Sequence, residues 1–180
     1  YLYHVITGHH VGVLPALIRA LLTPLSWIYG LLVIARGWLY ERRTLKPKRL
    51  PCAVISVGNI TVGGTGKTPT VIWIAKYLRD AGFRVAILLR GYRRQKRLSP
   101  IAVVSDGKEI LLSTAESGDE AQMIAKATPG VPVLVGKDRY GTGLEAIRRW
   151  DVQVVILDDG FQYRQLAREL DIVTVDGTRP

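Results

Sequence analysis

The stretch VGNITVGGTGKTP, from Val57 to Pro69, decides the fold because it resembles a phosphate-binding loop. In the common pattern G-x-x-x-x-G-K-[ST], the last three positions are occupied here by Gly66, Lys67 and Thr68. The pattern also requires a first glycine at position 61, where this chain carries Thr61. The stretch is therefore a variant of the loop, and the surrounding sequence has to show whether it binds phosphate.

The residues on both sides of the loop favour phosphate binding. PCAVISV (51–57) indicates a buried strand, and KTPTVIWIAKYLRD (67–80) has the spacing of an amphipathic helix. A glycine-rich turn between such elements closes backbone N–H groups around phosphate oxygens, and the helix N-terminus adds a favourable dipole. We therefore predict a nucleotide site in which Lys67 reaches the β- and γ-phosphates and Thr68 binds Mg²⁺. The alternative is an ordinary strand-to-helix turn. The predicted nucleotide-binding residues are Gly63, Gly64, Thr65, Gly66, Lys67 and Thr68.

After the loop, short apolar runs alternate with amphipathic stretches. This alternation is typical of βαβ units, so we predict an α/β domain of the P-loop NTPase type, a mainly parallel sheet flanked by helices. The further strands are expected at 84–89, 101–105, 131–135, 152–157 and 171–175, and the further helices at about 115–127 and 140–150.

Two acidic motifs are candidates for the chemistry. In VQVVILDDG, Asp158 and Asp159 end a hydrophobic strand, which places carboxylates at the sheet edge where α/β proteins bind ligands. We expect Asp158 to hold Mg²⁺, although an acidic pair can also cap a turn. In Gly118-Asp119-Glu120, a carboxylate could take the proton of an acceptor hydroxyl. Spacing alone favours the simpler interpretation that these carboxylates face a helix dipole.

Composition limits the class of partner. The 180 residues carry a formal net charge of +10, which favours an anionic partner. No aromatic-rich RNA-binding signature is present, so nucleic acid is not expected. The basic run 90–97 follows a buried strand and is either a solvated face or a site for an anionic headgroup. The single Cys52 excludes an intrachain disulfide and fits a reducing compartment.

The N-terminal segment has a different character. No charged residue lies between Arg19 and Arg36, and the basic run 42–49 follows. Thr23 and Pro24 are typical of a helix N-cap and first turn, so a helix is expected from about Pro24 to Tyr40. Its aromatic residues and its basic flank favour association with a membrane, whereas the alternative is a helix that covers the domain's own core. We predict two regions, a membrane-associated segment at 1–49 and a P-loop core at 50–180.

Together these motifs resemble the tetraacyldisaccharide 4'-kinases, the lipid A 4'-kinases of Gram-negative bacteria. In that family the early glycine of the loop corresponds to Gly58 and the Asn-x-Thr segment is normal. The resemblance continues in order along the chain through PLSWIYG (24–30), RGY (90–92), GDE (118–120), KDRY (137–140), ILDDGFQ (156–162) and VTVDGTRP (173–180).

The resemblance implies a membrane-associated kinase that uses ATP and Mg²⁺. It implies transfer of the γ-phosphate to the 4'-hydroxyl of tetraacyldisaccharide 1-phosphate. The reaction would take place at the cytoplasmic face of the inner membrane, next to anionic lipids. The resemblance implies no protein partner. Asp119 is then the general base. The remaining residues implied are Lys67, Thr68, Asp158 and Asp159 for catalysis and metal, and Arg90, Gly91, Tyr92, Arg93 and Gln162 for substrate.

The chain departs from the family at Leu89, Ala121 and Tyr163, where Ser, Pro and His are usual, and the family's smaller second lobe is expected to lie outside these 180 residues. One alternative function is a membrane-recruited P-loop ATPase switch of the partitioning type, whose signature lysine would stand at Val62. Another is a non-catalytic module that binds nucleotide and membrane.

Overall fold

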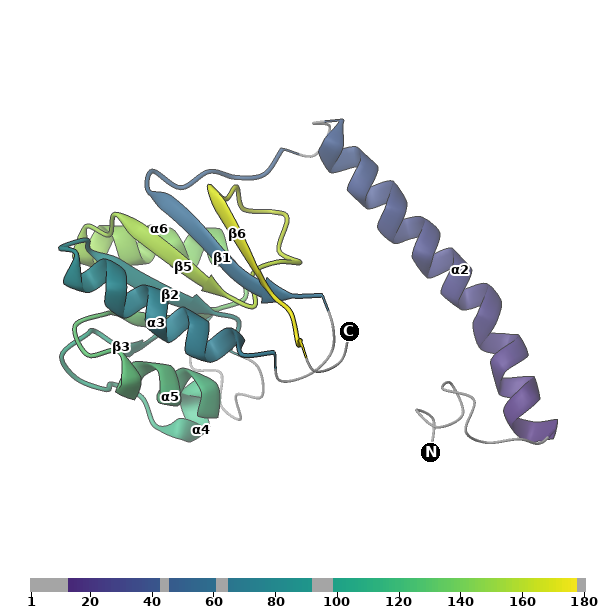
Figure 1. Cartoon of the computed structure of the whole chain (residues 1–180), viewed down its shortest axis with the longest axis horizontal. Helices are drawn as coiled ribbons and strands as arrows, with labels where there is room; N and C mark the ends of the chain where they lie inside the picture. Colours follow the sequence, from purple (N-terminus) through teal and green to yellow (C-terminus); the bar gives the residue numbers. More distant parts are fainter. Residues whose placement is uncertain (1–12, 43–45, 61–64, 92–98, 178–180) are drawn as a thin grey trace. The chain divides into compact units, whose positions relative to one another are not determined.

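The computed structural model describes residues 13–42, 46–60, 65–91 and 99–177. The chain divides into two compact units, Tyr1–Lys46 and Pro47–Pro180 (Figure 1). Within the described part of the first unit there is one long helix, whereas the second unit contains all the described strands together with the remaining described helices.

A six-stranded sheet forms the centre of the second unit. The strands stand in the order β3-β4-β2-β5-β1-β6, and every neighbouring pair is parallel except β3 and β4. The predicted mainly parallel sheet flanked by helices is therefore confirmed, with one antiparallel strand at its edge. The strands are β1 (Ala53–Asn59), β2 (Val85–Leu89), β3 (Ile101–Ser105), β4 (Val133–Gly136), β5 (Val154–Asp158) and β6 (Leu170–Thr174).

Helices cover both faces of the sheet. On one face, α3 (Lys67–Asp80) and α5 (Asp119–Ala127) pack Val71 and Ile124 against the sheet. On the other face, α6 (Arg139–Trp150) packs Ala146 against it. Successive side chains of a strand point to opposite faces, so the wholly apolar β2 contributes to both hydrophobic clusters.

Glycines stand directly before the first residues of α3 and α5. Gly66 precedes α3 with a φ of 79°, a left-handed conformation that side chains disfavour. Gly118, with a φ of 90°, divides the helix expected at 115–127 into α4 (Thr114–Ser117) and α5. The GDE motif therefore lies at a break between two helices, and Asp119 is the first residue of α5.

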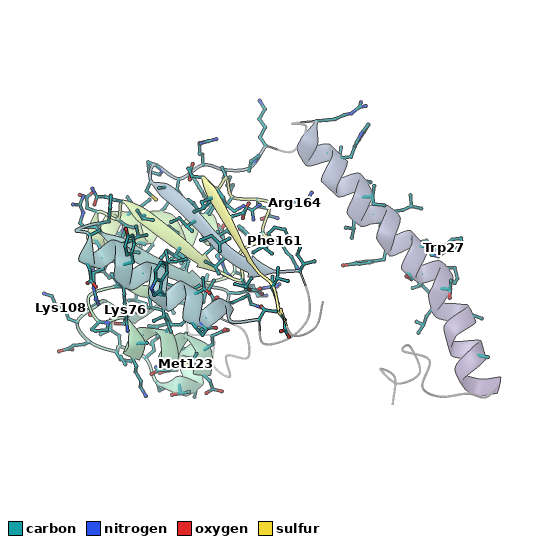
Figure 2. All side chains as sticks on the ribbon, viewed as in Figure 1. Trp27, Lys76, Lys108, Met123, Phe161 and Arg164 are labelled. Carbon is teal, nitrogen blue, oxygen red and sulfur yellow. The ribbon has the colours of Figure 1, made fainter. Side chains whose placement is uncertain are left out.

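The long helix of the first unit is α2 (Val13–Glu41), and Pro24 lies inside it. The sequence-based start at Pro24 is therefore wrong. The residues before Pro24 are mostly apolar and compatible with a helix. A proline inside a helix kinks it or removes a hydrogen bond without having to end it. The span Leu22–Leu39 is long and apolar enough to cross a membrane, with a mean hydropathy of 1.2 and none of it buried. Trp27, which projects from the helix in Figure 2, is 73% exposed.

Candidate functional site

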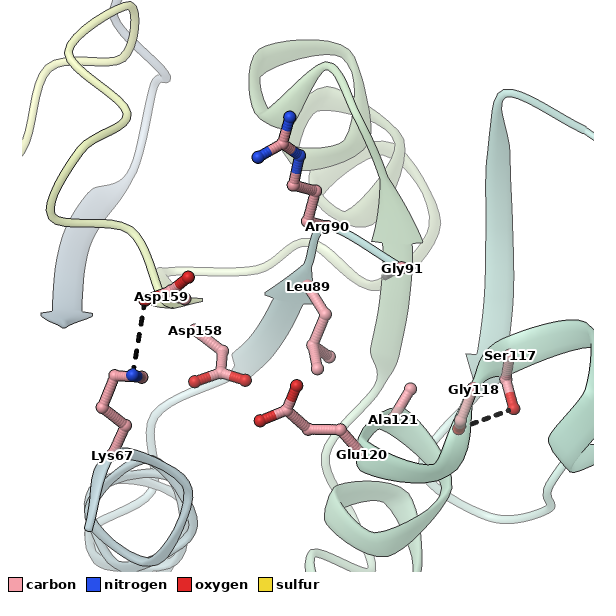
Figure 3. A pocket seen from close by; sticks show the side chains of 10 residues that line it. All are labelled: Lys67, Leu89, Arg90, Gly91, Ser117, Gly118, Glu120, Ala121, Asp158 and Asp159. Carbon is pink, nitrogen blue, oxygen red and sulfur yellow. Dashed lines mark hydrogen bonds and ion pairs between the residues drawn. The ribbon is translucent and has the colours of Figure 1, made fainter. Parts of the chain in front are cut away.

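A pocket of about 320 Å³ lies where β2 and β5 end, beside the first turns of α3 and α5 (Figure 3). Parallel strands of α/β proteins place their ligands at this edge. The pocket combines charged side chains from several elements with backbone of the Gly118 break. Its lining residues are Lys67, Leu89, Arg90, Gly91, Ser117, Gly118, Glu120, Ala121, Asp158 and Asp159.

Lys67, the first residue of α3, directs its ammonium group toward the acidic side of this pocket. Its Nζ donates a hydrogen bond to Asn59 Oδ1 at 2.9 Å and lies 3.7 Å from Asp159 Oδ1. The side chain is 21% exposed, so a phosphate arriving from solvent can still reach it. Asp159 itself is exposed and has a φ of 53°, a left-handed conformation uncommon outside glycine.

Asp158 is the buried carboxylate of the site. It is only 3% exposed, and its Oδ1 has no hydrogen-bond partner within the described residues. Burial, reinforced by the nearby carboxylates of Glu120 and Asp159, raises the pKa of Asp158 to about 7, although Arg139 and Lys67 oppose the shift. A buried anion with an unused oxygen is well suited to bind a cation.

Arg139 holds the backbone at the ends of β4 and β5 through its guanidinium group. Its guanidinium donates to the carbonyl of Gly136 at 2.6 Å and to the carbonyl of Asp158 at 3.4 Å. It is buried, and burial lowers its pKa to about 10, so it remains charged at neutral pH. Tyr163 Oη accepts a hydrogen bond from the backbone N–H of Arg139 at 3.2 Å and lies 3.4 Å from Asp138 Oδ1. The residue that replaces the usual histidine thus links the turn after β5 to the start of α6.

Thr68 and Glu120 connect the two helix N-termini. Thr68 Oγ1 donates to Glu120 Oε1 at 3.0 Å, and Glu120 and Asp158 point toward one another in the pocket (Figure 3). The described residues contain no preassembled group of three or more His, Cys, Asp or Glu ligands. Mg²⁺ usually takes only one or two protein carboxylates together with phosphate oxygens, so Thr68, Asp158 and Glu120 fit this ion.

The structure brings several of the predicted site residues together. Lys67, Asp158, Asp159, Arg90 and Gly91 all line the pocket, although the side chain of Arg90 points away from the carboxylates (Figure 3).

Other predicted residues lie outside the pocket lining. Asp119 and Gln162 are exposed and do not line the pocket, and Thr65 Oγ1 contacts Thr174 Oγ1 at 2.9 Å. The predicted positions that lie outside the described residues are Gly63, Gly64, Tyr92 and Arg93.

The structure places three further residues around the charged groups. The sequence offers Glu120 only as one of two carboxylates in the GDE motif, and it indicates no role for Arg139 or Asn59. Glu120 belongs to the GDE motif and Arg139 to the KDRY motif. The sequence therefore marks both segments, but it does not indicate which of their side chains face the site. Asn59 belongs to the segment where the loop departs from the common pattern. Its hydrogen bond with Lys67, which only the structure shows, places it at the site.

The chain is similar to known proteins over most of its length. A family model described as tetraacyldisaccharide-1-P 4'-kinase matches residues 18–180. The tetraacyldisaccharide 4'-kinase of Syntrophus aciditrophicus (strain SB) is 51% identical over 160 residues, which cover 89% of this chain and 42% of that protein. The enzyme of the same description from Halothermothrix orenii is 43% identical over 180 residues, covering 100% of this chain and 47% of that protein.

Among solved structures, LpxK from Aquifex aeolicus, crystallised in complex with ATP, is similar with a TM-score of 0.78 and 44% sequence identity. The match covers 87% of this chain and 48% of that one. The chain therefore spans about half the length of the relatives it matches.

Proposed function

Because the chain belongs to the tetraacyldisaccharide-1-P 4'-kinase family, we propose that this protein transfers the γ-phosphate of ATP to the 4'-hydroxyl of tetraacyldisaccharide 1-phosphate. The observation that carries the proposal is the convergence of Lys67, Asp158 and Glu120 in one pocket at the start of α3. ATP as the donor is supported by the ATP complex of the Aquifex relative.

The charged groups of the pocket match the demands of phosphoryl transfer. The reaction spreads negative charge over the oxygens of the transferred phosphoryl group, and fixed positive groups stabilise that charge. Lys67 supplies an ammonium, and the N-terminal amides of α3 supply a partial positive charge at the same place. Asp158 and Asp159 keep the lysine side of the pocket from being purely cationic, which favours a metal–nucleotide complex over a free anion.

Mg²⁺ is part of the proposal. When bound, it neutralises charge on the phosphate oxygens and helps to hold them in place. Thr68 Oγ1 and the unpartnered Asp158 Oδ1 are the atoms that we expect to hold it, with Glu120 close enough to exchange its bond to Thr68 for a place around the ion.

Two neighbouring carboxylates, those of Asp119 and Glu120, are candidates for the general base. Asp119 is exposed at the first turn of α5, where an acceptor hydroxyl can approach from solvent. Glu120 lies in the pocket but is already bonded to Thr68. We assign proton transfer from the 4'-hydroxyl to Asp119, because Glu120 is engaged at the metal side.

The proposal is tested with full-length protein in detergent micelles, by following labelled γ-phosphate from ATP into tetraacyldisaccharide 1-phosphate. Lys67→Ala and Asp119→Asn should each reduce transfer about 100-fold or more, since both act on the transition state. Glu120→Gln should raise the Mg²⁺ concentration needed for half-maximal rate. Glu109→Gln, an exposed carboxylate in the turn after β3, should leave the rate unchanged.

The results separate the rival functions. Label in the lipid that depends on Lys67 and Asp119 supports the kinase. Hydrolysis of ATP with unlabelled lipid refutes it and favours the ATPase switch. Binding of ATP without turnover leaves only the non-catalytic module.

We further propose that the protein works at the cytoplasmic face of the bacterial inner membrane, with α2 in the bilayer. The apolar side chains of α2 are exposed on its surface, including Leu25, Ile28 and Ile34. At its end, the guanidinium of Arg42 lies 3.7 Å from the centre of the Trp38 ring, an aromatic and basic pair typical of a membrane interface. The exposed Lys46, Lys48 and Arg49 follow, and each such residue contributes about 1 kcal/mol near anionic lipid.

A further inference from the structure

Asn59 occupies a position at the base of the phosphate loop that the proposed function has not used. It is the last residue of β1, paired in register with Thr174 of β6, and it is 9% exposed. Its Oδ1 accepts a hydrogen bond from Lys67 Nζ at 2.9 Å. The amide therefore comes from a buried strand end that is paired with β6, and it contacts the lysine expected to bind phosphate.

The lysine ammonium is held from two sides. Asn59 Oδ1 contacts it from β1, and Asp159 Oδ1 lies 3.7 Å away on the turn after β5. A flexible lysine side chain would otherwise lose rotamer freedom when it binds phosphate. Because this contact already restricts the side chain in the free protein, part of that entropy loss precedes nucleotide binding, which is preorganisation.

The neutral character of the acceptor matters. An ammonium has three donors, and an amide oxygen uses one of them without cancelling the charge. A carboxylate at the same place would add a second ion pair to that with Asp159 and would compete with phosphate for the lysine. Asparagine thus fixes the direction of Lys67 without cancelling its charge, and the donors that do not point to Asn59 remain for Asp159 and the ligand.

From this geometry we propose that Asn59 is a positioning residue that holds the Lys67 ammonium for the β- and γ-phosphates of the nucleotide. The proposal rests on the proposed function, because it takes the ligand of the pocket to be ATP. It gives the Asn-x-Thr departure from the common loop pattern a physical role.

A double-mutant cycle in nucleotide binding tests this role. The full-length protein in detergent micelles is titrated calorimetrically with a non-hydrolysable ATP analogue and Mg²⁺, in the forms Asn59→Leu, Lys67→Met and the two combined. Asn59→Leu should weaken binding of the analogue about tenfold, the size expected for a charge-assisted hydrogen bond. In the Lys67→Met background the same change should have less than a twofold effect, because Asn59 acts through the lysine. Competition by AMP, which lacks both phosphates, should be unaffected by Asn59→Leu.

Asn59→Asp provides a second test that keeps the shape and the acceptor. It should also weaken binding of the ATP analogue, because the added carboxylate would form an ion pair with Lys67 and compete with the phosphates for its ammonium group. Wild-type affinity in Asn59→Asp, or an equal loss from Asn59→Leu with and without Lys67, would overturn the positioning role. Thermal unfolding of each variant detects a general loss of fold. Gln153→Leu is the control, because it also removes an amide acceptor, the one that accepts from Arg84 N–H, just before the amino end of β5.

Failure of the underlying function gives a different result. If the wild-type protein does not bind the analogue, or if Lys67→Met binds it as tightly as wild type, ATP is not the ligand of this pocket and both proposals fall. If Lys67→Met weakens binding and Asn59→Leu does not, only the role of Asn59 falls.

Discussion

At the scale of single residues, the buried carboxylate of Asp158 reduces the stability of the free protein. Its carboxylate is buried beside other carboxylates with one oxygen unpartnered in the described part of the chain, and its pKa is raised to about 7. If this site binds a cation, as proposed above, the bound cation offsets this unfavourable energy. The same buried charge should therefore be visible in the pH dependence of stability.

The sign follows from the two pKa values. In the unfolded chain an aspartate ionises near pH 3.9, so below about pH 4 Asp158 is protonated in both states. Between pH 4 and 7 only the unfolded state loses the proton, so the native state becomes less stable as the pH rises, and the full cost is present above about pH 7. Asp158→Asn should therefore raise the free energy of unfolding at pH 8, without metal, by roughly 2–4 kcal/mol.

Urea denaturation of the metal-free protein at pH 4.5 and pH 8 measures this difference. The gain from Asp158→Asn should be small at pH 4.5 and large at pH 8. Glu109→Gln is the control, because this carboxylate is exposed in the turn after β3 and its loss should change stability little at either pH. A gain from Asp158→Asn that is the same at both pH values would contradict the account.

At the scale of elements, the end of β1 and the turn after β5 pack too closely for a side chain between them. Gly160 N–H donates to the carbonyl of Val57 at 3.1 Å, and a Cβ at Gly58 would lie 3.0 Å from the backbone nitrogen of Phe161 and in severe contact with its Cβ. The early glycine, displaced from its usual place in the loop, thus allows close packing between strand and turn.

Gly58→Ala should therefore separate two elements of the site. The clash involves Phe161 backbone, which cannot rotate away, so we expect a loss of about 1–3 kcal/mol in the free energy of unfolding, the usual cost of overpacking. Thermal unfolding measures it, with Gly177→Ala as the control, since no neighbouring atom lies within 4 Å of a Cβ there. An alanine tolerated equally at both positions would show that the turn can move.

Elements were predictable where local pattern suffices. The helix at 67–80 and the strand ending at Asp158 follow from apolar periodicity, and the rule that ligands meet the carboxyl ends of strands brought Lys67, Asp158 and Asp159 together. The antiparallel direction of β3 was not predicted, because IAVVS has the same apolar character as the parallel strands of the sheet.

Other features depend on contacts that the sequence does not encode locally. Neighbouring residues on a helix point about 100° apart, so whether Asp119 or Glu120 faces the pocket depends on where Gly118 breaks the helix. Similarly, Thr23 and Pro24 form a good helix start, but an apolar segment on the other side of them extends α2 back to Val13.

At the scale of the whole molecule, the two units differ in how their apolar side chains are buried. Both hydrophobic clusters lie within Pro47–Pro180, so that unit buries its own core. The span Leu22–Leu39 of α2 is entirely unburied, and its exposed apolar side chains need a non-aqueous partner. Deleting residues 1–46 should therefore leave a folded core that no longer binds lipid vesicles firmly.

Flotation with vesicles rich in anionic lipid tests the division of roles. The full-length protein should float at both 0.1 M and 0.5 M salt, because apolar burial of α2 does not depend on ionic strength, whereas the deleted form should bind only weakly and only at low salt through its remaining basic residues. Leu31→Asp with Ile34→Asp in the intact protein should act like the deletion, since charges near the middle of the span cost about 3 kcal/mol each in a bilayer. If the deleted form floats as well as the full-length protein at high salt, the core itself holds the membrane, and α2 has another partner.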